Sequence, residues 1–398
     1  MKTLSFFAIL LLLCFFKNIS YANNPQKPSY SKFFEQEKLF EEDNYYLLYD
    51  PDLDEVLIGN NHHQRIAPSS MTKLMTAYVV FSQLASKFIQ LDDYCLIGKD
   101  AWNKNGSTMF LDYGDVVQIS DLLKGLLVMS GNDASIALAQ TTVAGGYDSF
   151  INSMNAKAVE LGMYNTNFRN PHGLNEEGHY STLMDLAILT KRLYQDFPQY
   201  MEFLQIEEFE YSGIYQKNRN PLIKHHYDGI IGGKTGYTSQ GGYGVATIVK
   251  RNYRKLIAVV NNMANPQERE EAISKLLDFG FNNFKKIYFF KKGDILTDLD
   301  IWLGEKQKIS AIIDRDIIIN IPYKINSQDI EVEVKYLKPL IAPIATDQKI
   351  ADLYIKIKDY DSFHYNIYAN QDVKKVGLLP KVKLILNQKR LDFVSLFN

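Results

Sequence analysis

Cysteine and tryptophan are scarce in this chain of 398 residues, which contains two of each. Two cysteines are too few for a cysteine-ligated zinc site or an iron–sulfur cluster. The charges nearly balance, with 44 basic and 46 acidic residues, so a dedicated nucleic-acid binder is also excluded. No apolar run reaches the roughly 20 residues that a membrane-spanning helix needs. The length and the 46% hydrophobic content instead predict two or three domains with substantial cores.

The most continuous apolar run lies at the start of the chain, over residues 4–16. Lys2 precedes this run and Ser20-Tyr21-Ala22 follows it, which is typical of a secretory signal peptide over residues 1–22. The alternative, an uncleaved membrane anchor, would need a longer run. Cleavage after Ala22 removes two basic residues and no acidic one, leaving a net charge of about −4 and Cys95 alone. We therefore expect an exported protein without an intramolecular disulfide.

The apolar pattern predicts a mixed α/β (α+β) domain over residues 36–288, after a polar linker over residues 23–35. One predicted helix starts near Ser70, where apolar residues recur at helical spacing. Alternating segments near both ends of the domain predict strands, so a single sheet would join parts that are far apart in sequence. The expected strands cover residues 45–49, 56–58, 243–249 and 255–260, and the other helices cover residues 119–129, 133–144, 147–161, 183–194 and 267–283.

The remainder of the chain has a different character. Residues 289–377 contain alternating β-branched segments, such as 316–321 and 330–334, and predict a separate all-β domain. Residues 374–398 carry a net side-chain charge of +5. We interpret residues 378–398 as an amphipathic helix that lies on an anionic membrane, although residues 381–386 could instead form a last strand of the β domain.

A serine and a lysine three residues apart provide the first chemical signal. At the start of a helix, the spacing of Ser70 and Lys73 places the hydroxyl and the amine on one face, within hydrogen-bonding reach. A serine hydroxyl is a weak nucleophile until a base takes its proton. Lys73 could be that base if its pKa were lowered. The spacing alone is common, and a capping serine beside a solvated lysine is the other interpretation.

Two further triplets make this signal specific. Ser130-Gly131-Asn132 follows 60 residues after Ser70, on a turn between two predicted helices. Lys234-Thr235-Gly236 follows another 104 residues on, after a glycine-rich approach, and is expected to lead into the strand at 243–249. The order, spacing and local context of the three motifs are together the signature of penicillin-recognising serine acyltransferases.

Within that superfamily the chain resembles the low-molecular-mass penicillin-binding proteins of the D-alanyl-D-alanine carboxypeptidase type, over about residues 30–390. The resemblance also rests on residues 65–70, 170–174 and 218–220 and on Arg269-Glu270. It implies a five-stranded antiparallel sheet between helical layers, a C-terminal β domain and a terminal anchor. It also implies a peripheral protein on the periplasmic side of the bacterial inner membrane.

The resemblance implies an activity with no cofactor. The enzyme would remove the terminal D-alanine from peptidoglycan pentapeptides through an acyl-enzyme, and β-lactams would inhibit it. Ser70 would be the nucleophile, Lys73 the proton acceptor and Ser130 the proton relay. The implied substrate-binding residues are Asn132 for the amide, Lys234, Thr235 and Gly236 for the terminal carboxylate, Arg269 and more weakly Arg219 for added charge, and the backbone N–H of Tyr237 for the oxyanion.

Tyr237 departs from the family pattern, because many members have histidine there. Its backbone N–H is unaffected, but any role of the side chain is in doubt. The histidines do not predict a metal site. Neighbours such as His62-His63 and His225-His226 point to opposite sides of an extended chain, and neither these pairs nor His172 has carboxylates at ligand spacing.

Three other functions are alternatives to this interpretation. A class A β-lactamase shares the motifs but needs a glutamate in a Glu-x-x-Leu-Asn context, which this sequence does not contain. A D,D-endopeptidase typically has neither the β domain nor the anchor. A non-catalytic cell-wall-binding protein would not need Ser70, Lys73, Ser130 and Lys234 together.

Overall fold

The computed structural model describes residue 40 and residues 43–358, 362–379 and 382. The expected signal peptide and linker, and nearly all of the expected membrane helix, lie outside the described residues. The described chain forms two compact units. One contains the chain up to Asp294 together with Ile313–Asp329, and the other contains Ile295–Ile312 and the chain from Ile330 onward. The domain boundary expected between residues 288 and 289 stays a prediction.

The first unit is built on a five-stranded antiparallel sheet with the order β2-β1-β9-β8-β7. In this sheet Leu47 of β1 lies opposite Val259 of β9. The prediction of one sheet made from distant parts of the sequence is therefore confirmed. The strands are β1 (Tyr45–Asp50), β2 (Glu55–Asn60), β7 (Ile230–Thr238), β8 (Gly242–Arg251) and β9 (Arg254–Met263).

Strand β7 corrects one expectation, because Lys234-Thr235-Gly236 lies inside its own edge strand rather than in an approach to β8. The glycines of this segment favoured the expectation of an irregular approach, but close packing requires them. A Cβ atom on Gly236 would lie 3.0 Å from the carbonyl oxygen of Pro68, and one on Gly233 would lie 2.4 Å from that of Ala246. Glycine therefore permits β7 to pass directly beside the turn that carries Ser70.

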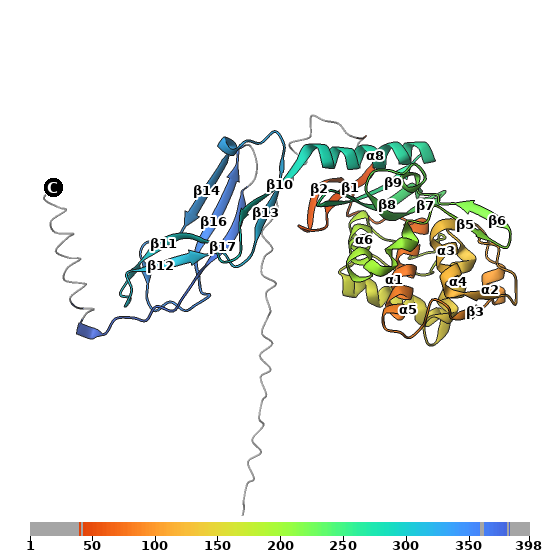
Figure 1. Cartoon of the computed structure of the whole chain (residues 1–398), viewed down its shortest axis with the longest axis horizontal. Coiled ribbons are helices and arrows are strands. Elements are labelled where there is room, and N and C mark those ends of the chain that lie inside the picture. Colours follow the sequence, from red (N-terminus) through yellow and green to blue (C-terminus); the bar gives the residue numbers. More distant parts are fainter. Residues whose placement is uncertain (1–39, 41–42, 359–361, 380–381, 383–398) are drawn as a thin grey trace, which may run out of the picture. The chain divides into compact units, whose positions relative to one another are not determined.

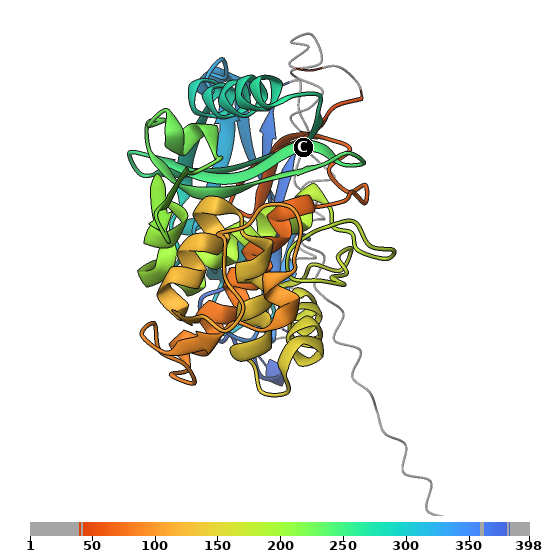
Figure 2. The same ribbon diagram turned by 90° about the vertical axis from the view of Figure 1, so that its right-hand side faces the viewer.

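Helices cover both faces of the sheet (Figures 1 and 2). Helix α8 lies on one face, and α6 packs on the other face against the same strands, β1, β8 and β9. Helix α1 passes through the helical layer beside α6 and is buried along most of its length. The main helices are α1 (Lys73–Ala85), α3 (Ile119–Lys124), α4 (Asn132–Thr141), α5 (Gly146–Leu161), α6 (Leu183–Asp196) and α8 (Pro266–Asn283).

Local geometry differs from the predicted helices at two places near the motifs. The helix expected from Ser70 starts with a 3₁₀ turn, Ser69–Thr72, and becomes α-helical at Lys73. The helix expected to run to Met129 widens into a π-type turn from Gly125 onward. Short elements that were not predicted lie around the helical layer. They are α2 (Lys99–Trp102), α7 (Pro221–Lys224) and the hairpins β3 (Tyr94–Leu96) with β4 (Val116–Gln118) and β5 (Glu208–Tyr211) with β6 (Ile214–Lys217).

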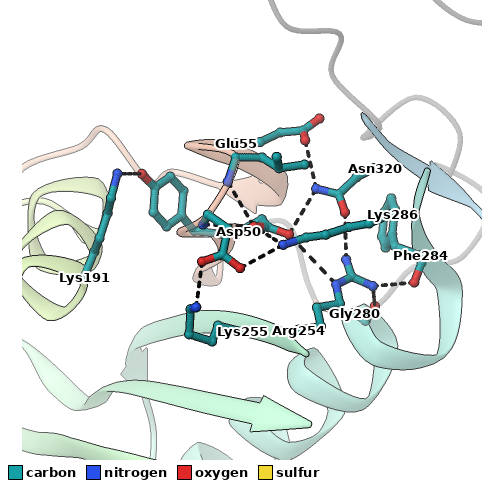
Figure 3. A network of polar contacts seen from close by, with 12 residues as sticks. Asp50, Glu55, Lys191, Arg254, Lys255, Gly280, Phe284, Lys286 and Asn320 are labelled. Atoms are coloured by element: carbon teal, nitrogen blue, oxygen red, sulfur yellow. Dashed lines mark hydrogen bonds and ion pairs between the residues drawn. The ribbon is translucent and has the colours of Figure 1, made fainter. Parts of the chain in front are cut away.

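Strands β10 (Phe284–Phe290) and β13 (Ile317–Pro322) form a two-stranded sheet that belongs to the first unit. The buried Asn320 of β13 donates to Asp50 Oδ2 at 3.2 Å and to Glu55 Oε2 at 2.9 Å, and it accepts from Arg254 Nη2 at 3.2 Å (Figure 3). Lys286 Nζ lies 3.0 Å from Asp50 Oδ1. A polar network thus joins β13 to the β1–β2 hairpin and β9.

The second unit is an all-β domain, as predicted. Its six-stranded sheet has the order β14-β16-β17-β12-β11-β15. Its inward side chains, such as Leu353, Ile355 and Ile367, are fully buried. The strands are β11 (Ile295–Trp302), β12 (Lys308–Ile312), β14 (Ile330–Lys335), β15 (Leu340–Ile341), β16 (Lys349–Ile357) and β17 (Phe363–Ala369). Among the described residues, no helix is long and apolar enough to cross a membrane.

Candidate active site

Ser70 and Lys73 are adjacent, as their spacing predicted. Ser70 sits in the 3₁₀ turn and Lys73 begins α1, so the tighter turn brings the two side chains together. Lys73 Nζ lies 3.0 Å from Ser70 Oγ. The lysine has no exposed surface, whereas the serine is half-buried and lines a cavity. The hydroxyl therefore faces the cavity while the amine lies behind it.

Two other oxygens fix the direction of the Lys73 amine. Lys73 Nζ lies 2.8 Å from Asn132 Oδ1 and 2.7 Å from the carbonyl oxygen of His172. Both oxygens can only accept hydrogen bonds. A neutral amine has two N–H groups and one lone pair. If the two N–H groups satisfy Asn132 and His172, the lone pair is directed at the Ser70 hydroxyl.

The surroundings favour that neutral form. Burial lowers the pKa of Lys73 well below its usual value, and the positive charges of Lys234 and Arg219 lower it further. Asp133 acts in the opposite direction. Lys73 is thus a base in its free amine form over a range of pH in which an exposed lysine would be charged.

Ser130 and Asn132 occupy the turn between α3 and α4. Ser130 has a left-handed backbone, with φ 62° and ψ 33°, and its side chain is almost fully buried but lines the cavity. The turn is closed by the Gly131 N–H, which donates to the carbonyl oxygen of Gly125 at 2.9 Å. Asn132 starts α4 and donates from Nδ2 to the carbonyl oxygen of Asn105 at 2.9 Å. Its amide therefore bridges Lys73 and the loop that precedes the motif.

Strand β7 supplies the opposite wall of the cavity. Lys234 is buried, and burial together with the charges of Arg219 and Arg269 lowers its pKa to about 7. Arg269 Nη2 donates to the carbonyl oxygen of Arg219 at 3.2 Å, which holds the two arginines together. This end of the cavity concentrates three cationic side chains. An anionic group that binds there would offset their mutual repulsion.

The cavity has a volume of about 920 Å³. It brings together most of the residues that the sequence analysis assigned to the site. Its walls include Ser70, Ser130, Arg219, Thr235, Gly236, Tyr237 and Arg269. The other three, Lys73, Asn132 and Lys234, are buried.

Tyr237 has a neighbour that the sequence did not suggest. Tyr243 lies opposite it in the β7–β8 register, and the two rings stack with centroids 4.1 Å apart. The guanidinium of Arg269 lies 5.9 Å from the centre of the Tyr243 ring. Tyr237 remains half-exposed at the cavity wall. The position that is often histidine in the family is thus an aromatic surface here.

Two further residues support the site, although the sequence analysis assigned no role to either. Gly173, with φ +87°, packs so closely that a Cβ would lie 1.8 Å from the carbonyl oxygen of Ser69. Asp133, which is buried, accepts from the backbone N–H groups of Met109 and Leu111. Burial raises the pKa of Asp133, although these backbone donors act against that shift. The available signals were positional: Asp133 directly follows the Ser130-Gly131-Asn132 motif, and Gly173 lies within residues 170–174, on which the resemblance rests.

None of the described histidines lines the cavity. The side chain of His172 is buried, and burial with nearby positive charges lowers its pKa to about 2, so it is neutral. The side chains of His225 and His226 are largely exposed beside Glu270 and Glu207. Within the described ranges no group of three or more histidine, cysteine, aspartate or glutamate side chains could hold a metal ion.

The chain is similar to several proteins of known identity. The chain is 34% identical to D-alanyl-D-alanine carboxypeptidase DacD of Salmonella typhimurium, over 85% of this chain and 88% of the relative. It is 32% identical to D-alanyl-D-alanine carboxypeptidase DacF of Bacillus subtilis, over 85% and 87%. The crystal structure of penicillin binding protein 5 from Haemophilus influenzae superposes with a TM-score of 0.72 at 32% identity, covering 83% of this chain and 97% of that one.

Family models match both parts of the chain. Residues 284–375 match the C-terminal domain of penicillin-binding protein 5. Residues 35–265 match the D-alanyl-D-alanine carboxypeptidase family of S11 peptidases. The match covers more than half of the chain and includes every motif of the cavity, so the protein belongs to the D-alanyl-D-alanine carboxypeptidase family of penicillin-binding proteins.

Proposed function

We propose that this cavity removes the terminal D-alanine from peptidoglycan pentapeptides through an acyl-enzyme on Ser70. One observation carries the proposal. Two acceptor oxygens, Asn132 Oδ1 at 2.8 Å and the His172 carbonyl at 2.7 Å, account for the two N–H groups of a neutral Lys73 amine. The Ser70 hydroxyl lies 3.0 Å from the same nitrogen, where the lone pair points. This arrangement fits a general base that is already aimed at its nucleophile.

The first step is acylation. Ser70 Oγ attacks the carbonyl carbon between the two D-alanines while its proton passes to the Lys73 amine. The carbonyl oxygen becomes an oxyanion, which the backbone N–H groups of Ser70 and Tyr237 stabilise. One such donor is worth on the order of 10²–10³ in rate. Because these donors belong to the backbone, tyrosine in place of histidine leaves this stabilisation unchanged.

The leaving amine needs a proton for the C–N bond to break. Ser130 faces the same cavity. It donates its proton to the D-alanine nitrogen and receives in exchange the proton that Lys73 accepted. The products of this step are free D-alanine and an ester on Ser70, and Lys73 is neutral again.

The terminal carboxylate of the substrate binds at the cationic end of the cavity. Lys234 and Thr235 contact it, with Arg269 and more weakly Arg219 contributing charge. Arg269 has a buried Nε atom with no hydrogen-bond partner in the described chain, which is consistent with a side chain that an anionic ligand completes. Asn132 holds the amide on the other side of the scissile bond.

Water completes the cycle. A water molecule attacks the ester carbonyl, its proton passes to Lys73, and the proton then returns to Ser70 Oγ as the tetrapeptide leaves. The named relatives are carboxypeptidases, which supports this reaction over the three alternatives.

The proposal is tested by supplying the purified protein with a soluble pentapeptide and, separately, with penicillin. D-alanine should be released from the peptide in many turnovers, while penicillin should be turned over slowly after it acylates the protein. Rapid penicillin hydrolysis without D-alanine release would support a β-lactamase instead.

Penicillin-binding peptidases of this family act on stem peptides and bind β-lactams, and the family indicates a periplasmic protein. The finer location is part of the proposal. Residues 374–398 carry a net charge of +5, and the described Leu378 and Leu379 are largely exposed. A basic segment with exposed apolar side chains fits the surface of an anionic membrane, which would place the protein on the periplasmic side of the inner membrane.

A further inference from the structure

Two aromatic side chains are exposed together on the helical layer of the first unit. Trp102, the last residue of α2, is 47% exposed, and Tyr113 is 67% exposed. Their ring centroids lie 6.4 Å apart. The adjoining β3–β4 hairpin adds Leu96 and Val116, which lie opposite each other and are also exposed. Exposed apolar side chains that gather in this way mark a binding surface more often than chance.

The chain leads directly from this pair to the active-site cavity. Three residues after Trp102, the carbonyl oxygen of Asn105 accepts from Asn132 Nδ2 at 2.9 Å. The carbonyl oxygen of Ser107 accepts from the Asn132 N–H at 2.7 Å, and its hydroxyl accepts from Arg219 at 2.7 Å. Three residues span at most about 11 Å, so Trp102 lies close to the Asn132 side of the cavity.

The proposed function gives the substrate a direction, and this inference rests on it. The terminal carboxylate occupies the Lys234 and Arg269 end, and Asn132 holds the amide on the other side of the scissile bond. The rest of the stem peptide therefore leaves the cavity past Asn132 and the loop at 105–107. Four residues separate the scissile bond from the glycan strand that carries the peptide. Extended, they span about 14 Å, which brings the glycan within reach of Trp102 and Tyr113.

The chemistry of the surface suits a polysaccharide. A sugar ring has an apolar face of C–H groups, which packs on an aromatic ring, and an edge of hydroxyl groups, which donate to carboxylates. Residues 92–115 contain five aspartates, Asp92, Asp93, Asp100, Asp112 and Asp115, against Lys99 and Lys104. The excess negative charge around the aromatic pair repels an anionic membrane. It does not repel the hydroxyl groups of a glycan, which can donate hydrogen bonds to the aspartates.

We propose that Trp102 and Tyr113 form a platform that binds the glycan strand from which the stem peptide extends. The platform would favour peptides that are still attached to polymeric peptidoglycan over free peptides of the same sequence. It acts on the binding of the polymer and does not touch the reacting atoms.

The test replaces both rings, in Trp102→Ala/Tyr113→Ala, and compares two substrates. With a soluble pentapeptide, D-alanine release should stay within about twofold of the unchanged protein. With purified peptidoglycan sacculi, the release rate at low sacculus concentration should fall about tenfold, the loss that about 1.4 kcal/mol of contact corresponds to. Cosedimentation with glycan strands freed of their peptides should weaken by a similar factor.

The matched control is Tyr253→Ala, because Tyr253 is 98% exposed but lies in the β8–β9 turn. It should behave as the unchanged protein with both substrates. The single variant Trp102→Tyr keeps an aromatic ring beside Tyr113. It should therefore retain most of the D-alanine release from sacculi. Stoichiometric acylation by penicillin verifies that each variant is folded. If the double variant fails that check, the single variant Tyr113→Ser in the exposed turn replaces it.

Equal activity of the double variant and the unchanged protein on sacculi, with equal cosedimentation, would overturn the platform. So would a loss of vesicle binding or of self-association in the double variant, because the pair would then serve a membrane or a second copy. If the unchanged protein releases no D-alanine from the soluble peptide, the proposed function fails. Cosedimentation with peptide-free glycan measures the platform independently of that result.

Discussion

The carbonyl oxygen of His172 accepts a hydrogen bond from Lys73, with Nζ and the oxygen 2.7 Å apart. Backbone therefore orients the Lys73 amine, and the loop that carries this carbonyl must hold its place. It does so at Gly173, which packs against the backbone of Ser69, next to the nucleophile. A shift of this loop would move the nucleophile turn and the base together.

Gly173→Ala should lower activity as well as stability. The positive φ of Gly173 accounts for a loss of stability, but the clash of the new Cβ should also displace the active site. The new Cβ would lie 1.8 Å from the Ser69 carbonyl oxygen, so one of the two segments must move. A displacement of about 1 Å costs on the order of 10² in rate, and we expect kcat for the pentapeptide to fall by at least that factor.

The control for this prediction is Gly162→Ala at the end of α5. Gly162 has a similar φ of +85°, but no atom lies within 4 Å of its added Cβ. This variant should lose about 1 kcal/mol of unfolding free energy and keep its kcat. Equal kcat values for the two alanine variants would contradict the role of the Gly173 contact.

Ser70 should carry the covalent adduct formed with penicillin. Mass spectrometry of the penicillin-treated protein should show one added mass, which peptide mapping places on Ser70. Ser70→Ala should show no adduct, and its D-alanine release should fall by more than about 10³-fold, because the substitution removes the oxygen that would attack the substrate. An adduct of full stoichiometry on Ser70→Ala would sink the assignment.

Lys234 should set the alkaline limb of activity. Its pKa in the free protein is about 7, since burial and two neighbouring arginines disfavour its charge. As the pH rises through this value the ammonium loses its proton and no longer attracts the terminal carboxylate. We therefore expect kcat/KM to fall above pH about 7, while the acid limb reflects protonation of Lys73.

Lys234→Arg provides the check, because a guanidinium keeps its charge throughout this range. The alkaline limb should move to higher pH in this variant, even if kcat/KM at its maximum is lower, and the acid limb should stay. An alkaline limb at the same pH in both proteins would assign it to another group.

Asn320→Leu should destabilise the first unit. Asn320 is fully buried and donates to both Asp50 and Glu55, so a leucine of similar size would take a hydrogen-bond donor from each of two buried carboxylates. We expect the unfolding free energy to fall by about 2–4 kcal/mol in urea. Asn326→Leu, at an exposed position soon after β13, should change it by less than about 0.5 kcal/mol. Similar values for the two variants would show that the network contributes little.

Truncation after Gly377 should release the protein from membranes without loss of activity on soluble peptide. The change removes residues 378–398, which contain four of the six basic side chains of the tail. A full-length variant with Lys389→Glu and Arg390→Glu keeps the apolar residues and should bind anionic vesicles more weakly. If the truncated protein stays on membranes, the anchor lies elsewhere in the chain.

The location of the candidate site was predictable from the sequence because three motifs mark it with side chains at recognisable spacings. The motifs identify Lys73, Ser130 and Lys234 from the sequence alone, and the cavity brings these motifs together. What could not be predicted is carried by the backbone or by close packing. The carbonyl oxygen of His172 has no side-chain signal, and Gly173 differs from other glycines only in what lies next to it.

The fold was predictable to a similar degree. The split sheet followed from apolar patterns at both ends of the domain, but the strand bearing Lys234 was missed because Gly232, Gly233 and Gly236 lower strand propensity where the backbone must approach its neighbours. The alternation of Ile317–Pro322 predicted a strand and could not identify its partner, since pairing depends on contacts far along the chain.

The pairing of β10 with β13 means that no single cut separates a complete catalytic unit from the rest. Protein ending at residue 288 would lack Asn320 and would leave the β1–β2 hairpin without the side chain that bridges its two carboxylates. A protease that cleaves within residues 295–312 would leave both parts of the first unit in place, held by the strand pairing and by the hydrogen bonds of Asn320. Nicked protein of this kind could retain penicillin binding. The loss of the full-length band on a gel would then not mean that the active site is lost.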